Sequence, residues 1–365
     1  MSRTLTVAPS LWLASCLLCF AHSGHDHAEA TPEGFAEPMP DEWTSGDAPL
    51  RFEVMYTRHH LPDQAQAVLE KLHGGFGVDR REGRGETYFT VPGAGIVRLS
   101  ADLGKAELIA TDADMRDVNM HNATVWLDAD SQAYVSYSGN DVGKVFTTAP
   151  NGALLHTLPA PAAGQAFDDD TVTGYFRDGG PFVPTDADYL DGRLYVTTGY
   201  SPLDYVLTAS VDLSDGVAMS WTALAFGGRG DGVGQFGTGH GVTISPDGAE
   251  VHVSDRKNGK IEAFTRDGAY VSTLRLPDGA WPCDVDYEGE YGVTGCLFGL
   301  DHERGAPIYV LKGGEVVSTI RPKEDLGLEG FQHIHDAVLR EVGGVLYIVA
   351  QAWNPGDFAI LRQVM

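Results

Sequence analysis

From residue 74 onward the chain consists of short runs of alternating apolar and polar residues, separated by Gly, Asp and Asn. Such runs are rich in Val, Tyr, Thr and Ile, and examples are residues 193–198, 249–254 and 344–349. Alternation at a period of two between turn-forming residues is typical of β-strands. We therefore expect an all-β fold over residues 74–365.

One helical pattern precedes these strands. Over residues 62–73, the apolar side chains of Ala65, Val68, Leu69 and Leu72 fall at positions i, i+3, i+4 and i+7. This spacing places them on one face of a helix. The sequence therefore predicts one short helix inside a short N-terminal extension, residues 51–73.

The strands recur as a unit. The clearest copy spans residues 226–274, where a Gly-rich approach leads into four short runs joined by tight turns, the content of one β-propeller blade. Six copies over residues 73–365 give about 49 residues each, within the usual blade length. Two stacked β-sandwiches, the alternative, lack a long fixed period. The sequence therefore predicts a six-bladed β-propeller, and the other copies open near Gly77, His121, Thr185, Cys283 and His335.

The first 50 residues have a different character. Arg3 precedes an apolar stretch, residues 11–21, which is too short for a membrane helix and suits a secretory signal peptide over residues 1–23. Cys16 leaves a second interpretation open, a lipoprotein anchored at that residue. Residues 24–50 are rich in His, Pro and acidic side chains and predict a flexible linker. We expect a secreted or periplasmic protein.

Charge restricts the partners. The chain carries 25 Lys and Arg against 51 Asp and Glu, a formal net charge of −26, and has no basic run. Nucleic acids and anionic membrane surfaces are therefore unfavourable partners, because both need clustered positive charge. No other segment is apolar for long enough to span a membrane. We expect a monomer that takes a small-molecule or peptide substrate in its central channel.

Two cysteines, Cys283 and Cys296, remain once the signal peptide is removed. An even pair in an exported chain predicts one disulfide across neighbouring strands. Two buried thiols are the alternative.

Histidines occupy equivalent positions in alternate repeats. Alternate blades of a six-fold disc lie about 120° apart, so three imidazoles there should converge on one point in the channel. Three neutral imidazoles with a fourth position open suit a catalytic zinc ion. The residues that open the six innermost strands are Gly77 or Val78, His121, Asp186, His240, Asp284 and His335. The remaining histidines show no such periodicity. His252 lies within a strand and is assigned to packing, and five others are assigned to the surface or to local polar contacts: His59, His60, His73, His156 and His302.

Residues 234–240, Gly-Gln-Phe-Gly-Thr-Gly-His, and 253–261, Val-Ser-Asp-Arg-Lys-Asn-Gly-Lys-Ile, resemble an NHL-type propeller blade. They are most similar to the equivalent blade of the peptidylglycine α-amidating lyases, which cleave peptidyl-hydroxyglycines. Further similar positions are 184–186, 195–200 and 335–336. The resemblance covers about residues 74–365, and it implies an NHL-type six-bladed propeller with zinc-dependent carbon–nitrogen lyase activity.

The resemblance also implies two metal sites. The family's three zinc ligands fall on His121, His240 and His335. Its structural calcium site falls on Asp336, together with backbone carbonyls near Phe76 and Ala123, and hard oxygen ligands of this kind suit calcium.

Catalytic roles follow from the same resemblance. Tyr200 falls on the family's catalytic tyrosine, a base with a depressed pKa, and Arg256 falls on an arginine that holds the substrate carboxylate. Two positions depart from the family pattern. An essential first-blade arginine is missing from residues 88–93, and a methionine is replaced by His333, which could join the metal or serve as a second base. These departures put the substrate in doubt more than the fold.

Three function classes therefore stay open. The first is an exported zinc-dependent lyase or hydrolase with an amidating-lyase-like site. The second is a non-catalytic propeller that binds a protein or glycan, with the metal as a structural plug. The third is a zinc- or copper-handling protein that also uses the His-rich segment at residues 22–27.

Overall fold

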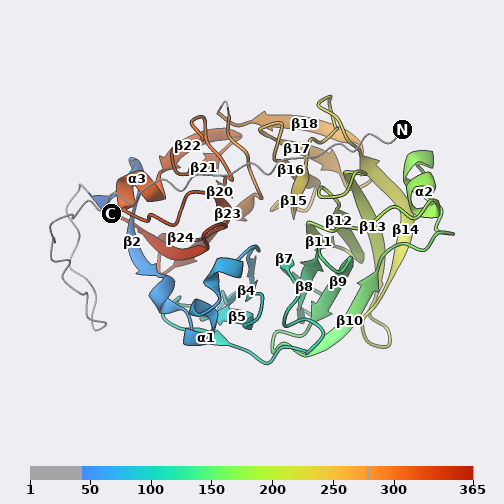
Figure 1. Cartoon of the computed structure of the whole chain (residues 1–365), viewed down its shortest axis with the longest axis horizontal. Helices are drawn as coiled ribbons and strands as arrows, with labels where there is room; N and C mark the ends of the chain where they lie inside the picture. The colour runs from blue at the N-terminus through green and yellow to red at the C-terminus, as the bar shows by residue number, and fades with distance from the viewer. Residues whose placement is uncertain (1–42, 278, 365) are drawn as a thin grey trace, which may run out of the picture. The chain divides into compact units, whose positions relative to one another are not determined.

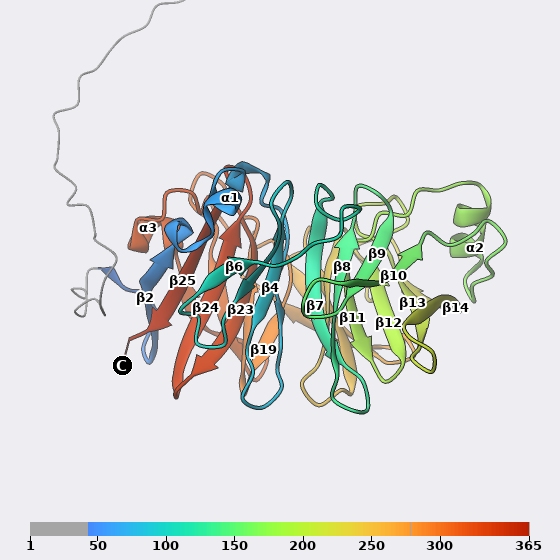
Figure 2. The ribbon, with the colours of Figure 1, turned by 90° about the horizontal axis from the view of Figure 1, so that it is seen from below.

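The computed structural model describes residues 43–277 and 279–364, which belong to one compact unit. Their strands form six sheets arranged around a central axis (Figure 1). Figure 2 shows the strands of neighbouring sheets standing side by side. The predicted all-β six-bladed β-propeller is confirmed. The predicted signal peptide, Cys16 and residues 24–42 of the predicted linker lie outside the described residues.

Five blades are four-stranded antiparallel sheets whose strands follow chain order. Adjacent blades contact each other through the first strand of each, so these strands surround the channel. The first two blades comprise β3 (Gly77–Val78), β4 (Thr87–Val91), β5 (Gly95–Leu99) and β6 (Ala106–Leu108), then β7 (Met120–Leu127), β8 (Ala133–Gly139), β9 (Lys144–Thr148) and β10 (Leu154–Pro159). The third and fourth comprise β11 (Asp186–Leu190), β12 (Arg193–Thr197), β13 (Tyr205–Asp212) and β14 (Ala218–Gly227), then β15 (Gly239–Ile244), β16 (Glu250–Asp255), β17 (Lys260–Thr265) and β18 (Tyr270–Arg275). The fifth comprises β19 (Asp286–Glu288), β20 (Tyr291–Gly295), β21 (Ile308–Lys312) and β22 (Glu315–Ile320).

The sixth blade joins the two ends of the described chain. Its inner strands are β23 (Ile334–Val342), β24 (Val345–Ala352) and β25 (Asp357–Gln363), and its outer strands are β2 (Leu50–Thr57) and β1 (Ser45–Asp47). The assignment of residues 45–50 to a linker, and of residues 51–57 to an extension outside the propeller, is therefore wrong. The cause is a pairing that local sequence does not reveal, since β2 pairs with β25 about three hundred positions away, and Leu50 and Phe52 are buried in the core.

Helices are few and short. The predicted helix at residues 62–73 is two separate turns, α1 (Asp63–Gln66) and the 3-10 turn η3 (Leu69–Lys71), because Val68 between them has non-helical backbone angles. The other helical segments are η2 (Arg58–His60), α2 (Asp170–Arg177) and α3 (Pro322–Leu326). None of the helices in the described part of the chain has the length and apolar character needed to cross a lipid bilayer.

Aspartates on the innermost strands tie each blade to a neighbour. Asp186 Oδ2 accepts a hydrogen bond from Val242 N at 2.8 Å, and Asp188 Oδ2 accepts one from Ile244 N at 2.8 Å. Asp336 Oδ2 accepts from Phe76 N at 2.7 Å, which links the sixth blade to the first. Each of these bonds satisfies a backbone N–H that would otherwise be buried without a partner, so these ties fix the relative positions of the strands that carry the candidate site.

Cys283 and Cys296 are free, fully buried thiols, so the predicted disulfide is wrong and the alternative of two buried thiols is confirmed. Pro282 is the residue opposite Cys296, while Cys283 N bonds to Gly295 O at 3.0 Å. Because side chains alternate between the two faces of a sheet, this one-residue offset places the two sulfurs on opposite faces. Burial raises the pKa of Cys283 to about 12.

Candidate metal centre

Three buried imidazoles meet in the central channel. His121 lies on β7, His240 on β15 and His335 on β23, and none is more than 1% exposed. The ring centroids are 4.6 Å apart for His121–His240, 4.6 Å for His121–His335 and 4.9 Å for His240–His335. The three alternate blades thus bring these histidines to one place.

A local irregularity aims each of these rings. The register between the innermost strand and its neighbour shifts at Met120/Ala123, at Gly239/Gly241 and at Ile334/Asp336, and each shift brackets one of the three histidines. Such β-bulges re-aim a side chain and are frequent next to functional sites. The repetition of the shift in three blades turns all three imidazoles inward.

The three rings share one hydrogen-bond pattern. Nδ1 of His121 faces Thr185 O at 2.6 Å, Nδ1 of His240 faces Cys283 O at 2.7 Å, and Nδ1 of His335 faces Gly74 O at 2.7 Å. A carbonyl only accepts, so each Nδ1 carries a proton and donates it. Each Nε2 therefore presents its lone pair to the channel, as the outer-shell partners of metal-binding histidines usually arrange.

The inward lone pairs outnumber the available protons. His335 Nε2 faces His121 Nε2 at 3.1 Å, and Tyr200 Oη lies 3.0 Å from Nε2 of both His121 and His240. One phenol proton cannot serve three acceptors. Burial holds the pKa of all three imidazoles well below the ordinary value, so protonation does not balance the cluster. This donor set fits a metal cation, and neutral imidazoles suit zinc among others.

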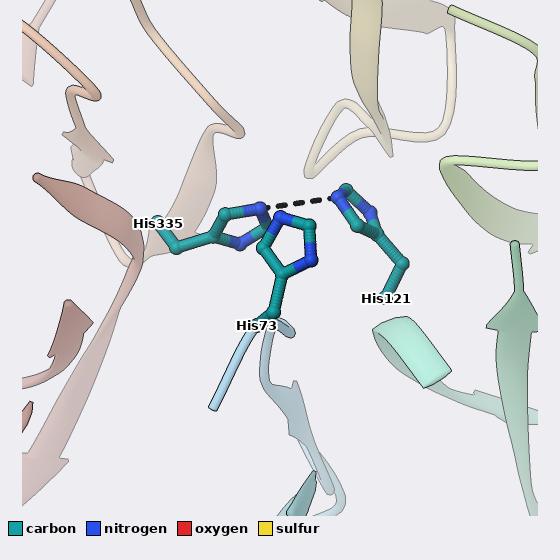
Figure 3. A group of neighbouring side chains, drawn as sticks. All are labelled: His73, His121 and His335. Carbon is teal, nitrogen blue, oxygen red and sulfur yellow. Dashed lines mark hydrogen bonds between the residues drawn. The ribbon is translucent and has the colours of Figure 1, made fainter. Parts of the chain in front are cut away.

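A fourth imidazole, His73, lies against the same cluster. The candidate ligand atoms of His73, His121 and His335 all fall within 4.8 Å of one another (Figure 3), so these three residues could hold a metal ion. Burial and the nearby charge of Arg256 lower the pKa of His73 to about 4. The assignment of His73 to a surface or local polar role is therefore wrong. Repeat alignment could not find it, because His73 precedes the first blade; its position four residues before Gly77 was the only signal in the sequence.

Tyr200 and Arg256 form the wall beside the cluster. Arg256 donates from one guanidinium nitrogen to Tyr200 Oη at 3.0 Å, and its guanidinium lies 5.1 Å from the centre of the Tyr200 ring. Arg256 is only 9% exposed, and no carboxylate among the described residues forms an ion pair with it. Asp255, the adjacent acid, bonds to Asn258 instead. A buried guanidinium without a counter-charge is costly, and it suits an anionic ligand.

The pKa of Tyr200 lies above its ordinary value, because burial raises it more than the charge of Arg256 lowers it. The depressed pKa expected for this tyrosine is therefore wrong for the protein's own residues. Additional positive charge beside the hydroxyl is what would lower this pKa.

The two departures from the family pattern do not add a residue to this cluster. Nδ1 of His333 faces Leu297 O at 3.2 Å, and its ring packs against Phe298 and Trp353 at 4.8 and 6.0 Å. No described arginine of the first blade takes the missing position either, since all four form ion pairs elsewhere: Arg80 with Asp286, Arg81 with Asp79, Arg84 with Glu86 and Arg98 with Glu107.

Carboxylates line another part of the channel. Asp336 is fully buried, and burial raises its pKa to about 7. Burial also raises the pKa values of Asp186 and Asp284 well above normal, and the negative charge of each neighbour adds to the effect. A Cβ on Gly75 would press on Asn122 Oδ1 and lie 2.9 Å from Asp336 Oδ2, so glycine lets both oxygens approach the backbone. Oxygen donors of this kind suit a hard cation.

Comparisons with known proteins support the fold. No family model and no curated protein matches the sequence. Among solved structures, a streptogramin B lyase matches with a TM-score of 0.51 at 11% identity, over 84% of this chain and 97% of that one. Virginiamycin B lyase of Staphylococcus aureus gives 0.45 at 13% identity, over 89% and 97% of the two chains. A hydrazine synthase chain of Kuenenia stuttgartiensis gives 0.37 at 15% identity over 62% of this chain, which spans 55% of the synthase chain. These identities are too low to transfer an activity.

Proposed function

We propose that this protein is a zinc-dependent lyase that cleaves the carbon–nitrogen bond of a hydroxyglycine-like substrate. The observation that carries the proposal is the excess of lone pairs at His121, His240 and His335 beside the buried Arg256, which has no carboxylate partner among the described residues. The imidazole cluster favours a bound cation, and the guanidinium favours a bound anion. Tyr200 Oη contacts both groups, so one small molecule could reach both. A substrate with a carboxylate and an adjacent hydroxyl meets both demands.

Arg256 and Tyr200 have separate roles in the proposed reaction. Arg256 binds the substrate carboxylate and orients the hydroxyl toward the three Nε2 atoms. When bound, zinc supplies a Lewis acid that polarises the hydroxyl and adds positive charge beside Tyr200. That added charge would favour loss of the Tyr200 phenol proton to solvent. The phenolate Oη would then take the hydroxyl proton and pass it to the leaving amide nitrogen, while a carbon–oxygen double bond forms and the carbon–nitrogen bond breaks. The products are an amide and glyoxylate.

The test is direct. Purified protein is loaded with zinc, its metal content is measured, and a peptidyl-α-hydroxyglycine is added. We expect glyoxylate release above the spontaneous rate. Fully loaded protein that releases none would reject this substrate, and the absent first-blade arginine would then be the first difference to examine.

A structural metal is the second candidate. His73 offers a fourth nitrogen, and a site with four protein ligands is typical of structural zinc. In that case the faces of the propeller would bind a protein or glycan. Metal-loaded protein that resists exchange with small anions and has no lyase activity would favour this function.

Two further parts of the proposal rest on the sequence. Export of the protein is inferred from the apolar stretch at residues 11–21, with anchoring at Cys16 as the alternative. A structural calcium ion is proposed at Asp336, where the buried carboxylate and Asn122 Oδ1 approach the same glycine. The zinc- or copper-handling alternative also stays open for the His-rich segment at residues 22–27.

A further inference from the structure

His73 differs from the other three imidazoles in how it is held. It belongs to no blade, since it lies between η3 and β3, and it is partly exposed where the other three are fully buried. Its ring packs edge-on against His121 at 4.8 Å and His335 at 4.5 Å, and it faces Trp353 at 5.5 Å. Three imidazoles are fixed by backbone carbonyls, whereas His73 Nδ1 meets a side-chain amide, that of Asn119, at 3.0 Å.

The amide of Asn119 is positioned to select the tautomer of His73. Its Nδ2 faces both His73 Nδ1 and Asn140 Oδ1, at 3.0 and 2.9 Å, while its Oδ1 is buried with no partner. In this arrangement His73 Nδ1 accepts, so Nε2 carries the proton and cannot bind a metal. A 180° rotation of the amide, with Asn140 turning alongside, presents Oδ1 to His73. Nδ1 then carries the proton and Nε2 offers a lone pair, the pattern seen at the other three histidines.

The backbone at this point cannot move with the ring. Gly74 O accepts the bond from His335 Nδ1, and a Cβ on Gly74 would lie 3.0 Å from Met120 O. These contacts hold the backbone beside His73, so rotation of its side chain is the simplest way for the ring to approach or leave the cluster. His73 is partly exposed, whereas the other three rings are fully buried, so His73 has the most freedom to rotate.

We propose that His73 is an exchangeable fourth ligand, which binds the metal through Nε2 when no substrate is present and yields that position to an incoming oxygen or nitrogen donor, with Asn119 as its positioning residue. This inference rests on the metal site of the proposed function. The proposal accounts for a cluster in which three imidazoles are held by backbone carbonyls and one, His73, is held by a side chain, next to Arg256. The three fixed imidazoles retain the ion, and the fourth controls access to it.

Cobalt(II) and azide test the proposal without turnover. Cobalt replaces zinc, its visible absorption reports the ligand set, and azide titration reports how available the fourth position is. We expect His73→Ala to keep about one cobalt per chain, to change the visible spectrum, and to bind azide about tenfold more tightly than the wild type, the usual scale for a ligand-shell change. His73→Gln serves as a second variant if the alanine variant folds poorly. His302→Ala is the matched control, because His302 stacks on Phe298 at 4.4 Å, away from the cluster.

Asn119→Asp sharpens the test. A carboxylate only accepts, so it fixes the proton on His73 Nδ1 and should make azide binding about tenfold weaker than in the wild type. An unchanged spectrum and azide affinity in both His73 variants would overturn the proposal. Loss of cobalt from His73→Ala, to the level of a variant lacking His240, would overturn it too, since His73 would then be a permanent ligand. Failure of glyoxylate release would reject the substrate but leave these spectra as they are.

Discussion

The central channel has two regions built from opposite chemistry. One holds the neutral imidazoles His121, His240 and His335 with Tyr200 and Arg256. The other is a cavity of about 360 Å³ whose lining includes the carboxylates Asp186, Asp188, Asp284, Asp286 and Glu288. Burial lowers the pKa of the imidazoles and raises that of the buried aspartates, so it favours the neutral form in both regions.

The same burial has different consequences for metal binding. We call the imidazole cluster the nitrogen region and the carboxylate-lined cavity the oxygen region. A neutral imidazole is already the form that binds a metal, so the nitrogen region can take a cation without losing protons. A neutral aspartic acid must first release its proton, so the oxygen region binds a cation only against a pH-dependent cost. The two regions should therefore differ in metal affinity, in pH dependence and in what each contributes to function.

The largest effect should come from removing a fixed imidazole. In His240→Ala only two fixed imidazoles, His121 and His335, remain beside the exchangeable His73, and we expect zinc to fall from about one per chain to a small fraction after dialysis against a chelator. Metal analysis by mass spectrometry measures this. His252→Ala is the control, because His252 bonds to Tyr287 Oη at 2.6 Å on the side of a blade. Unchanged zinc in the His240 variant would show that His240 is not a required ligand and would leave His73, His121 and His335 as the binding set.

Tyr200→Phe tests the chemistry of the nitrogen region without removing a ligand. The variant should keep its zinc and fold and should lower turnover by about two to four orders of magnitude, the usual contribution of a positioned base. Glyoxylate release at matched zinc content is the measurement. Turnover equal to that of the wild type would exclude Tyr200 as the base.

Arg256→Ala tests the unpaired guanidinium. Loss of a charge-assisted bond to the carboxylate should raise KM by about ten- to a hundredfold, with a smaller change in kcat. A substrate analogue with a neutral amide in place of the carboxylate provides the control, and it should respond little to the substitution. Equal losses on both substrates would show that Arg256 supports the fold of the site instead.

The smallest effect should come from the oxygen region. Because the pKa of Asp284 is raised in the folded state, that state binds protons more tightly, and the free energy of unfolding falls as pH rises through the folded-state pKa. Without divalent cations, Asp284→Asn should exceed the wild type in stability by about 1–2 kcal/mol at pH 8, and the difference should vanish near pH 4, the ordinary carboxyl range.

Urea unfolding with a chelator present measures the stability of this variant. Asp267→Asn, at a side chain that is 85% exposed, is the control and should change little. Calcium should reverse the order by stabilising the wild type more than the variant. A pH profile shared by the wild type and Asp284→Asn, with no response to calcium, would contradict a cation site among these carboxylates.

The propeller fold and the repeated histidines of the site could be predicted from the sequence because both are periodic. Strands alternate at period two and blades recur, so the starts of the innermost strands and the convergence of His121, His240 and His335 could be inferred by alignment of copies. His73 and β2 belong to no copy, and their positions depend on contacts across the whole chain. The unpaired Cys283 and the raised pKa of Tyr200 depend on a one-residue register and on burial, which pattern alone does not specify.

The closure of the sixth blade has a consequence for the protein's synthesis. His335 donates to Gly74 O across 261 positions of chain, and β2 finds its partner only in β25. Almost the whole polypeptide must therefore be synthesised before His335 can reach His121 and His240. A polypeptide that ends before β23 lacks His335 and the partner of β2, so it could assemble neither the sixth blade nor the three-imidazole cluster.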